Sequence, residues 1–147
     1  MHKVPDYRLW LGNEGDIQDI RQVFDQGVEV LVDLAAHEPP RHLPRETIYC
    51  HVPLIDGPDN PIWLVQLAVG TVIHLLKSNV PTLVYCGGGM SRSPCIAAAA
   101  ISAIKGCTIP EALTHLSQSE AMDINPGLLA EVQRIFAGAK NAGAKKG

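Results

Sequence analysis

The sequence predicts one α/β domain with a central, mostly parallel sheet of four to five strands that is flanked by helices. Short apolar runs alternate along the chain with stretches whose apolar residues recur at helical spacing. The last run, PTLVYC, is wholly apolar, as expected for a strand at the centre of a sheet that is covered on both faces. A length of 147 residues, of which 46% are hydrophobic, suffices for one sizeable core.

The first part of the chain reads as strand, helix, strand, loop and strand. Apolar runs over residues 7–12, 28–35 and 47–55 have the length of strands. The polar stretch DIQDIRQVFDQG keeps its apolar residues on one helical face, and Gly27 stands where a glycine commonly ends a helix. Residues 38–44 are too rich in proline for either element and predict a loop.

The middle of the chain adds a helix, a strand and a second helix. Residues 61–77 have helical spacing with Pro61 in the first turn, and residues 81–86 form the wholly apolar strand. The Ala-rich residues 93–105 predict a helix that starts directly after a glycine-rich loop. This succession of strand, glycine loop and helix is the central unit of the expected fold.

Two further helices complete the expected domain. Thr108 begins a capping box for the first of them, and Pro126 opens a helix that we expect to run to about Phe136. The last residues are mostly small or charged, with too little apolar content to pack. We therefore expect one folded domain over residues 1–137 and a disordered tail over residues 138–147.

Composition excludes several classes of function. The net charge of −3, with dispersed Lys and Arg, provides no basic stripe for nucleic acid or an anionic membrane. No apolar stretch is long enough for a membrane span, and the first residues lack the apolar core of a signal peptide, so we expect a cytoplasmic protein. The four cysteines show no CxxC spacing and accompany no histidine cluster, which predicts reduced thiols and no metal site.

The residues that carry chemistry lie between the apolar strand and the Ala-rich helix. Cys86 ends the strand, and Arg92 follows after five intervening residues. Consecutive glycines let backbone N–H groups turn inward, so the loop predicts an anion site at a helix N-terminus with a phosphate dianion as its ligand. The expected phosphate-binding residues are Gly87, Gly88, Gly89, Met90, Ser91 and Arg92, of which Met90 and Ser91 contribute mostly backbone.

Cys86 and Arg92 have complementary roles in this interpretation. The planar guanidinium of Arg92 can grip two phosphate oxygens, which a lysine cannot do in the same geometry. A helix N-terminus and a nearby guanidinium both favour the thiolate form of a cysteine. We therefore expect Cys86 to be an ionised nucleophile that faces the bound phosphorus.

Cys86, Arg92 and Ser93 form the pattern Cys-x5-Arg-Ser, which resembles the signature loop of protein tyrosine phosphatases, and Cys-x-x-Gly-x-x-Arg-Ser resembles their dual-specificity branch. The resemblance covers about residues 4–136. The matching segments outside the loop are residues 7–12, 27–35 and 125–128. Low-molecular-weight phosphatases place the loop near the amino terminus, and rhodanese-like sulfurtransferases usually have four residues between Cys and Arg. Both families therefore fit less well.

The resemblance implies hydrolysis of phosphate monoesters in two steps, without a metal or an organic cofactor. Cys86 forms a phosphocysteine, while an aspartate about thirty residues upstream donates a proton and later activates water. Asp56 has that spacing and directly follows an apolar strand, and Asp59 is the second candidate. Either aspartate could instead cap the next helix, a task that is also open to Asn60. Ser93 matches the family hydroxyl that helps the thiolate leave in the second step.

One residue departs from the family pattern. The family usually has histidine directly before the nucleophile, where its hydrogen bonds hold the loop, whereas this chain has Tyr85. The departure keeps open an alternative function, a phosphate-loop module that binds phosphorylated partners with little turnover. Retention of Cys86, Arg92, Ser93 and Asp56 together favours the enzyme, because a binder needs neither the thiol nor the acid.

The resemblance also bears on substrate and regulation. Phosphoinositide phosphatases tend to carry lysines inside the loop, and there is none between Cys86 and Arg92, so we expect phosphorylated proteins as substrates. Cys50, Cys95 and Cys107 lie in apolar segments and are expected in the interior. Family members sometimes protect the nucleophile by a reversible disulfide. Cys50, on a neighbouring strand, is the candidate partner for one, although we favour simple packing.

Overall fold

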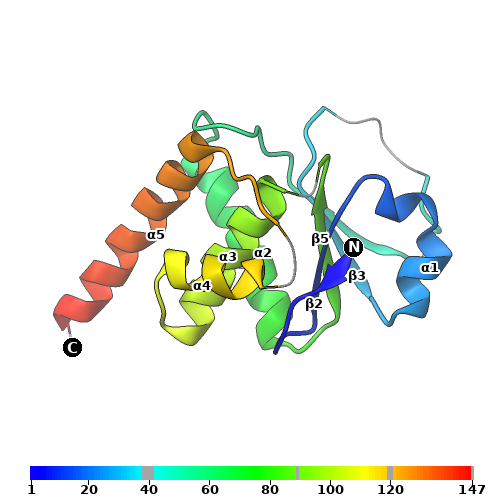
Figure 1. Ribbon diagram of the computed structural model, residues 1–147, viewed down its shortest axis with the longest axis horizontal. Helices are drawn as coiled ribbons and strands as arrows, with labels where there is room; N and C mark the ends of the chain where they lie inside the picture. Colours follow the sequence, from blue (N-terminus) through cyan, green and yellow to red (C-terminus); the bar gives the residue numbers. More distant parts are fainter. Residues whose placement is uncertain (38–41, 89, 119–120, 147) are drawn as a thin grey trace.

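Figure 1 shows the computed structural model, in which helices cover both faces of a central sheet. The structure describes residues 1–37, 42–88, 90–118 and 121–146, with side chains up to residue 136. The strands are β1 (His2–Lys3), β2 (Leu9–Asn13), β3 (Val30–Asp33), β4 (Ile48–His51) and β5 (Thr82–Cys86). The helices are η1 (Asp16–Gln18), α1 (Ile20–Asp25), α2 (Ile62–Lys77), α3 (Arg92–Lys105), α4 (Ile109–Ser117) and α5 (Pro126–Lys146).

The sheet places β5 in its centre. The strand order is β1-β2-β5-β3-β4, and all strands run parallel except β1, which pairs antiparallel with β2. The carboxyl ends of parallel strands meet at one edge of a sheet, so the loops that follow β3, β4 and β5 all start along this edge. The expected mostly parallel, helix-flanked sheet is therefore confirmed, at five strands.

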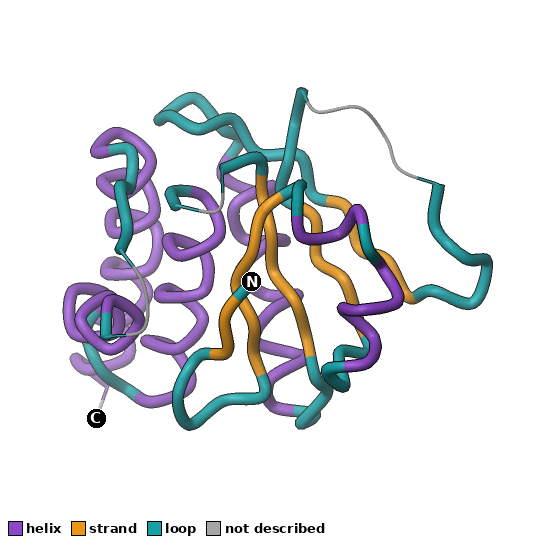
Figure 2. The backbone as a smooth tube through the Cα atoms, turned by 45° about the vertical axis from the view of Figure 1, so that its right-hand side comes forward, coloured by secondary structure: helices purple, strands orange, loops and turns teal. Residues whose placement is uncertain are grey.

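Strand β5 separates two cores, because its side chains alternate between the two faces of the sheet. Val84 and Cys86 belong to the larger core, which contains residues from α2, α3, α4 and α5. Leu83 and Tyr85 belong to a smaller core beneath η1 and α1. Figure 2 shows the same asymmetry, with the short η1 and α1 on one side of the strands and the longer helices on the other. Cys86 and the preceding tyrosine consequently face opposite sides of the sheet.

Helix α3 crosses the larger core directly behind the glycine-rich loop. Its residues 93–102 are all buried, and a run of alanines lets the helix pack closely against its neighbours. The helix ends at Gly106, whose left-handed φ of 74° carries no steric cost without a Cβ. Thr108 then caps α4 as expected: its hydroxyl accepts a hydrogen bond from the Glu111 amide at 3.2 Å and donates to the Glu111 carboxylate at 3.0 Å.

Several boundaries differ from the sequence-based expectations. The helix expected over residues 16–27 is broken, because the Asp19 carboxylate accepts a hydrogen bond from the Gln22 amide and starts α1 anew. Pro61 lies at the N-cap of α2 and not in its first turn. α5 continues past Phe136 to Lys146, whereas the sequence predicts its end near Phe136. Side chains of the last residues lie outside the described part, so the disordered tail over residues 138–147 stays a prediction.

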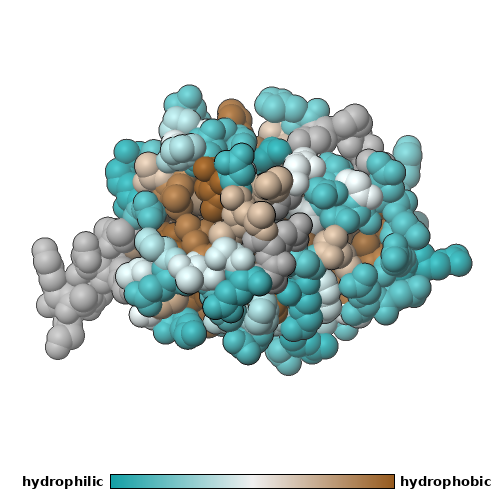
Figure 3. Space-filling view, in the orientation of Figure 1, coloured by the Kyte–Doolittle hydropathy of each residue, from teal (hydrophilic) through white to brown (hydrophobic). Residues whose placement is uncertain are grey.

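Figure 3 shows that polar residues cover most of this face of the molecule, while apolar residues gather over its helical half. Within the described residues, no single helix is long and apolar enough to cross a membrane. Helices α3 and α4 reach the required length and composition only when taken together across a bend of 118°.

Candidate active site

The predicted nucleophile lies at the carboxyl end of the central strand. Cys86 is the last residue of β5, and only 1% of its surface is exposed. Asn13, the last residue of β2, is paired with Cys86 in the sheet. The amide of the following residue, Glu14, donates a hydrogen bond to the Gly87 carbonyl at 3.4 Å. Neighbouring strands therefore fix the point at which the loop leaves the sheet.

The glycine-rich loop leads from Cys86 into α3, as the sequence predicts. Gly87 is half-buried, whereas Gly88 and Met90 are exposed, and Gly89 lies outside the described residues. The Met90 carbonyl accepts a hydrogen bond from the Asp123 amide at 2.9 Å, so the segment before α5 supports the loop from outside. A phosphate-binding role for these backbone groups stays a prediction.

Arg92 and Ser93 open α3, and Arg92 is half-buried. Arg92 Nη1 donates to the Leu54 carbonyl at 3.0 Å, which ties the guanidinium to the chain just before the predicted acid. Ser93 is fully buried, and its hydroxyl has no hydrogen-bond partner among the described residues. A buried hydroxyl without a partner costs about 1–3 kcal/mol of stability.

The two candidate acids differ in where they lie. Asp56 Oδ1 accepts a hydrogen bond from the Ser91 hydroxyl at 2.5 Å, so the carboxylate lies against the glycine-rich loop of residues 87–91, which we call the phosphate loop. Asp59 is exposed and makes no hydrogen bond or ion pair with any residue that the structure describes. The geometry therefore favours Asp56 over Asp59. The role of Asp56 as a proton donor remains to be tested.

The segment that carries Asp56 is held by Asn60. Only 5% of Asn60 is exposed, and its amide group makes three hydrogen bonds: Oδ1 accepts from the Ile55 amide, while Nδ2 donates to the carbonyls of Ile55 and Gly57. The suggestion that Asn60 caps the next helix is therefore wrong, because α2 has no side-chain cap. The amide group instead encloses Asp56 in a tight turn. We call residues 54–60 the acid loop.

Ser91 is the residue whose side chain the sequence analysis underestimated. Besides its bond to Asp56, Ser91 Oγ accepts a hydrogen bond from the Asn125 amide at 2.9 Å. The expectation that Ser91 contributes mostly backbone is therefore wrong. Asn125 in turn starts α5, since its Oδ1 accepts from the amides of Gly127 and Leu128. One hydroxyl thus joins the phosphate loop, the acid loop and the start of the last helix.

A second polar group lies on the opposite face of the sheet, beside the nucleophile. The Tyr85 hydroxyl hydrogen-bonds to that of Tyr49, which donates to Asp33 Oδ2 at 2.5 Å. Burial, together with the negative charge of Asp33, raises the pKa of both tyrosines above the ordinary value. We call these three residues the tyrosine network. Strand alternation points the Tyr85 ring away from Cys86, so its hydroxyl meets Tyr49 and not the nucleophile.

The remaining cysteines correct part of the sequence-based picture. Cys95 is fully buried, and burial, with a smaller contribution from Asp56, raises the pKa of its thiol to about 12. Cys50 and Cys107 are half-buried, less than expected. Cys50 lies on β4, which β3 separates from β5, so two strand spacings of about 4.8 Å divide it from the strand of Cys86. That span exceeds the reach of about 7 Å between Cα atoms, so no disulfide joins Cys50 to Cys86 in this arrangement.

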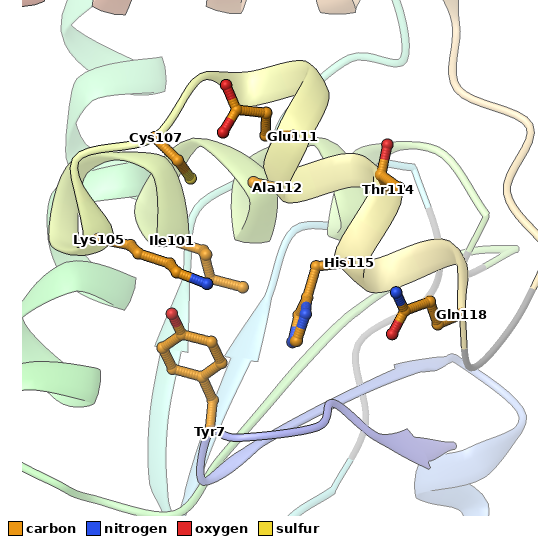
Figure 4. Close-up of a pocket in the computed structure, with 9 residues that line it drawn as sticks. All are labelled: Tyr7, Ile101, Lys105, Cys107, Glu111, Ala112, Thr114, His115 and Gln118. Carbon is orange, nitrogen blue, oxygen red and sulfur yellow. The ribbon is translucent and has the colours of Figure 1, made fainter.

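The described residues also bear on two other kinds of site, a metal centre and a cavity away from Cys86. They hold no group of three or more His, Cys, Asp or Glu residues that could bind a metal ion. Figure 4 shows a cavity of about 250 Å³ where α3 meets α4, with Lys105, His115 and Tyr7 in its wall. The Nε2 atom of His115 makes a hydrogen bond to the Pro5 carbonyl oxygen at 2.8 Å. Helix α3 begins in the phosphate loop and ends here, so this cavity lies at the far end from Cys86.

Comparisons with known proteins show which proteins this chain resembles. Human dual specificity protein phosphatase 15 is 26% identical over 139 residues, which cover 93% of this chain and 46% of that protein. The chain thus spans about half the length of this curated relative. No protein-family model matches the chain.

Solved structures share the fold. Human DUSP28 superposes with a TM-score of 0.79 and 19% identity, covering 92% of this chain and 95% of that one. A human tyrosine phosphatase-like serine/threonine/tyrosine-interacting protein reaches 0.76 with 18% identity, covering 89% and 92%. At this identity the likeness establishes the fold alone. Together with the curated relative and the Cys-x5-Arg-Ser loop, this likeness makes the chain similar to the dual-specificity phosphatase branch of the protein tyrosine phosphatase superfamily.

Proposed function

We propose that this chain hydrolyses phosphate monoesters and that phosphorylated proteins are its substrates. The observation that carries the proposal is the contact of Ser91 with Asp56, which brings a carboxyl group to the loop between Cys86 and Arg92. An ionised carboxylate at this place would repel a phosphate dianion. A protonated one would donate to the leaving group, so the arrangement suits catalysis better than binding alone.

In the first step the Cys86 thiolate attacks phosphorus. The S–P bond forms while the bond from phosphorus to the ester oxygen breaks, and that oxygen takes the proton of Asp56. Arg92 and the loop amides hold the remaining phosphate oxygens and stabilise their charge in the transition state. The burial of Cys86 at the strand end supports this role, because it excludes water from the thiolate.

In the second step water attacks the phosphocysteine. The Asp56 carboxylate takes a proton from the water, the S–P bond breaks and inorganic phosphate leaves. The sulfur departs as a thiolate, which a neighbouring hydroxyl can stabilise. The unpartnered, buried hydroxyl of Ser93 is suited to donate that hydrogen bond.

The rim of the site favours an aromatic phosphate ester. Ile55 precedes Asp56 and Met90 precedes Ser91, so each apolar residue is the chain neighbour of one partner in the Asp56–Ser91 contact. Ile55 is 47% exposed and Met90 is 44% exposed, so both can contact a substrate. No lysine in the loop is available for the additional phosphates of an inositol headgroup. We therefore propose phosphotyrosine as the preferred target, with phosphoserine and phosphothreonine accepted less well.

A specific observation supports the alternative of a binding module. Tyr85 replaces the histidine that the family uses to hold the loop, and one structural neighbour is described as phosphatase-like and as an interacting protein. A weakly active chain would keep the anion site and lose turnover. The two functions differ in the fate of the bound ester, so one experiment separates them.

The test is the hydrolysis of p-nitrophenyl phosphate and of a phosphotyrosine peptide in the presence of a chelator. We expect turnover of both esters that Cys86→Ser abolishes. Asp56→Ala should reduce turnover of the phosphotyrosine peptide, whose leaving phenoxide is the more basic, by about 10²- to 10⁴-fold, the usual range for a general acid. Asp59→Ala is the matched control and should leave the rate unchanged. Tight binding of vanadate without any turnover by the wild-type chain would instead establish the binding module.

A further inference from the structure

The Ser91 hydroxyl has a fixed direction. The Asn125 amide can only donate, so at 2.9 Å it occupies an acceptor site on Ser91 Oγ. The proton of the hydroxyl is thereby left for Asp56 Oδ1 at 2.5 Å. Among the residues that the structure describes, this is the only hydrogen bond to the Asp56 carboxylate. Ser91 therefore selects one oxygen of the acid and leaves the other available.

The start of α5, which orients Ser91, is also packed against the acid loop. Gly127 has no Cβ, and one placed there would lie 2.9 Å from Cδ of Pro58 in the acid loop. The Asn125 side chain caps the same turn through the amides of Gly127 and Leu128. The backbone that donates to Ser91 is thus fixed by two contacts that do not involve Asp56.

The acid loop itself is set by other residues. Asn60 holds the amide and carbonyl of Ile55, and Arg92 holds the carbonyl of Leu54. These bonds fix the backbone but leave the exposed side chain of Asp56 to rotate. A rotating carboxyl group would spend most of its time away from a leaving group, because each staggered rotamer points it elsewhere. The contact with Ser91 removes this freedom.

We propose that Ser91 is a positioning residue for the general acid: it fixes Asp56 over the phosphate loop and stabilises the carboxylate that proton transfer leaves behind. This inference rests on the proposed function. Before the first step Ser91 holds Oδ1 while Oδ2 carries the proton to the leaving oxygen. After transfer, the same hydroxyl donates a charge-assisted hydrogen bond to the new carboxylate. In the second step it holds this carboxylate toward the attacking water.

A positioning role and a merely structural role predict different dependence on the leaving group. If Ser91 acts through Asp56, its hydroxyl matters only when the leaving oxygen needs a proton. Phenyl phosphate releases a basic phenoxide that needs one, whereas difluoromethylumbelliferyl phosphate releases a much more acidic phenol. If Ser91 only ties the loop to α5, its removal disturbs the phosphate site and slows both substrates alike.

The experiment measures kcat and KM of the full chain on both substrates. It compares the wild type with Ser91→Ala and with two variants of matched shape, Ser91→Thr and Ser91→Val. Loss of one hydrogen bond to a charged group corresponds to about a ten- to hundredfold effect. We expect Ser91→Ala to lower kcat on phenyl phosphate by this factor while KM changes little. On the umbelliferyl ester we expect little change in kcat. Thr retains the hydroxyl and should restore the rate. Val, which has nearly the same shape without the hydroxyl, should not.

A double-mutant cycle completes the test. In the Asp56→Ala background, Ser91→Ala should cause no further loss on phenyl phosphate, because the group that it positions is gone. Equal losses on the two substrates, or independent losses from Ser91 and Asp56, would overturn the inference. If Ser91→Ala unfolds, the comparison of Thr with Val decides in the same way. If the wild type hydrolyses neither of the two substrates, the proposed function itself is refuted.

Discussion

Two hydrogen-bonded groups flank the end of β5, and they differ in exposure and in origin. The tyrosine network lies among adjacent strands on the α1 face, and its Asp33 is 6% exposed. The group of Asp56, Ser91 and Asn125 lies at the opposite face, on loops that only tertiary packing brings together. A buried network contributes to stability, whereas loop contacts at a site contribute to rate. Two adjacent residues of β5 thus differ in role: Tyr85 belongs to the network that we connect with stability, and Cys86 leads into the loop that we connect with the reaction rate.

The largest expected effect concerns the rate side of this comparison. Arg92→Lys keeps a positive charge but loses the planar fork and the bond to the Leu54 carbonyl. We expect kcat to fall by about 10²- to 10³-fold, as for loss of one oriented donor to a transition state, with little loss of stability. The control is Arg134→Lys, whose guanidinium is exposed and pairs only with Glu131 in the described structure. An equal loss of kcat in Arg92→Lys and Arg134→Lys would contradict the role of Arg92 in stabilising the transition state.

The next effect tests the stability side. Tyr49→Phe removes the hydroxyl that links Tyr85 to Asp33 and leaves two buried polar groups without their partner. We expect the free energy of unfolding to fall by about 1–3 kcal/mol, measured by chemical denaturation. Tyr7→Phe is a matched control, because the Tyr7 hydroxyl makes no hydrogen bond among the described residues. A large drop in kcat with unchanged stability would reverse the roles assigned to the two groups.

A third change disturbs the loop contacts without touching a polar side chain. Gly127→Ala places a methyl group 2.9 Å from Pro58, so the acid loop and the start of α5 have to separate. Overpacking of this kind costs about 1–3 kcal/mol, and we expect a slower reaction on phenyl phosphate in particular. Gly70→Ala is the control, since nothing lies within 4 Å of a Cβ there. That change in mid-helix should stabilise by about 0.5–1 kcal/mol.

The smallest effect concerns the thiols on the helical side. Burial raises the pKa of the Cys95 thiol to about 12, so at mildly alkaline pH it stays protonated and unreactive. We expect iodoacetamide to label Cys86 and not Cys95, as read by peptide mass spectrometry, with vanadate protecting the labelled site. Labelling of Cys95 in the folded chain would show that the interior opens on the time scale of the reaction.

Much of the fold follows from local pattern, which explains where sequence reasoning worked. Apolar runs and helical spacing predict the parallel sheet, and the interval from Cys86 to Arg92 predicts a loop between β5 and α3. The short antiparallel β1 was missed, since two residues carry no periodicity. The break at Asp19 was missed because a capping residue inside an amphipathic stretch does not change its apolar spacing.

The candidate site was less accessible to such reasoning, for a physical reason. Ser91 and Asp56 lie 35 positions apart, and their contact depends on how two loops fold over one edge of the sheet. Asn60 looked like a helix cap because of its place before Pro61, yet its amide turns back into the acid loop. Strand alternation could have been applied to the sequence alone. Because successive side chains of a strand point to opposite faces of the sheet, it predicts that Tyr85 and Cys86 lie on opposite faces.

The bond between Asn125 and Ser91 has a consequence for partial unfolding. It makes the edge of the sheet that carries Cys86 depend on a contact between two loop segments, and loop contacts open at a lower free energy than core strands. Detachment of the start of α5 would release Ser91 and its acid while the sheet remained intact. Activity would then disappear at a lower denaturant concentration than helical circular dichroism. Enzymatic rate would thereby become a sensor of subglobal opening at the carboxyl-terminal side of the domain.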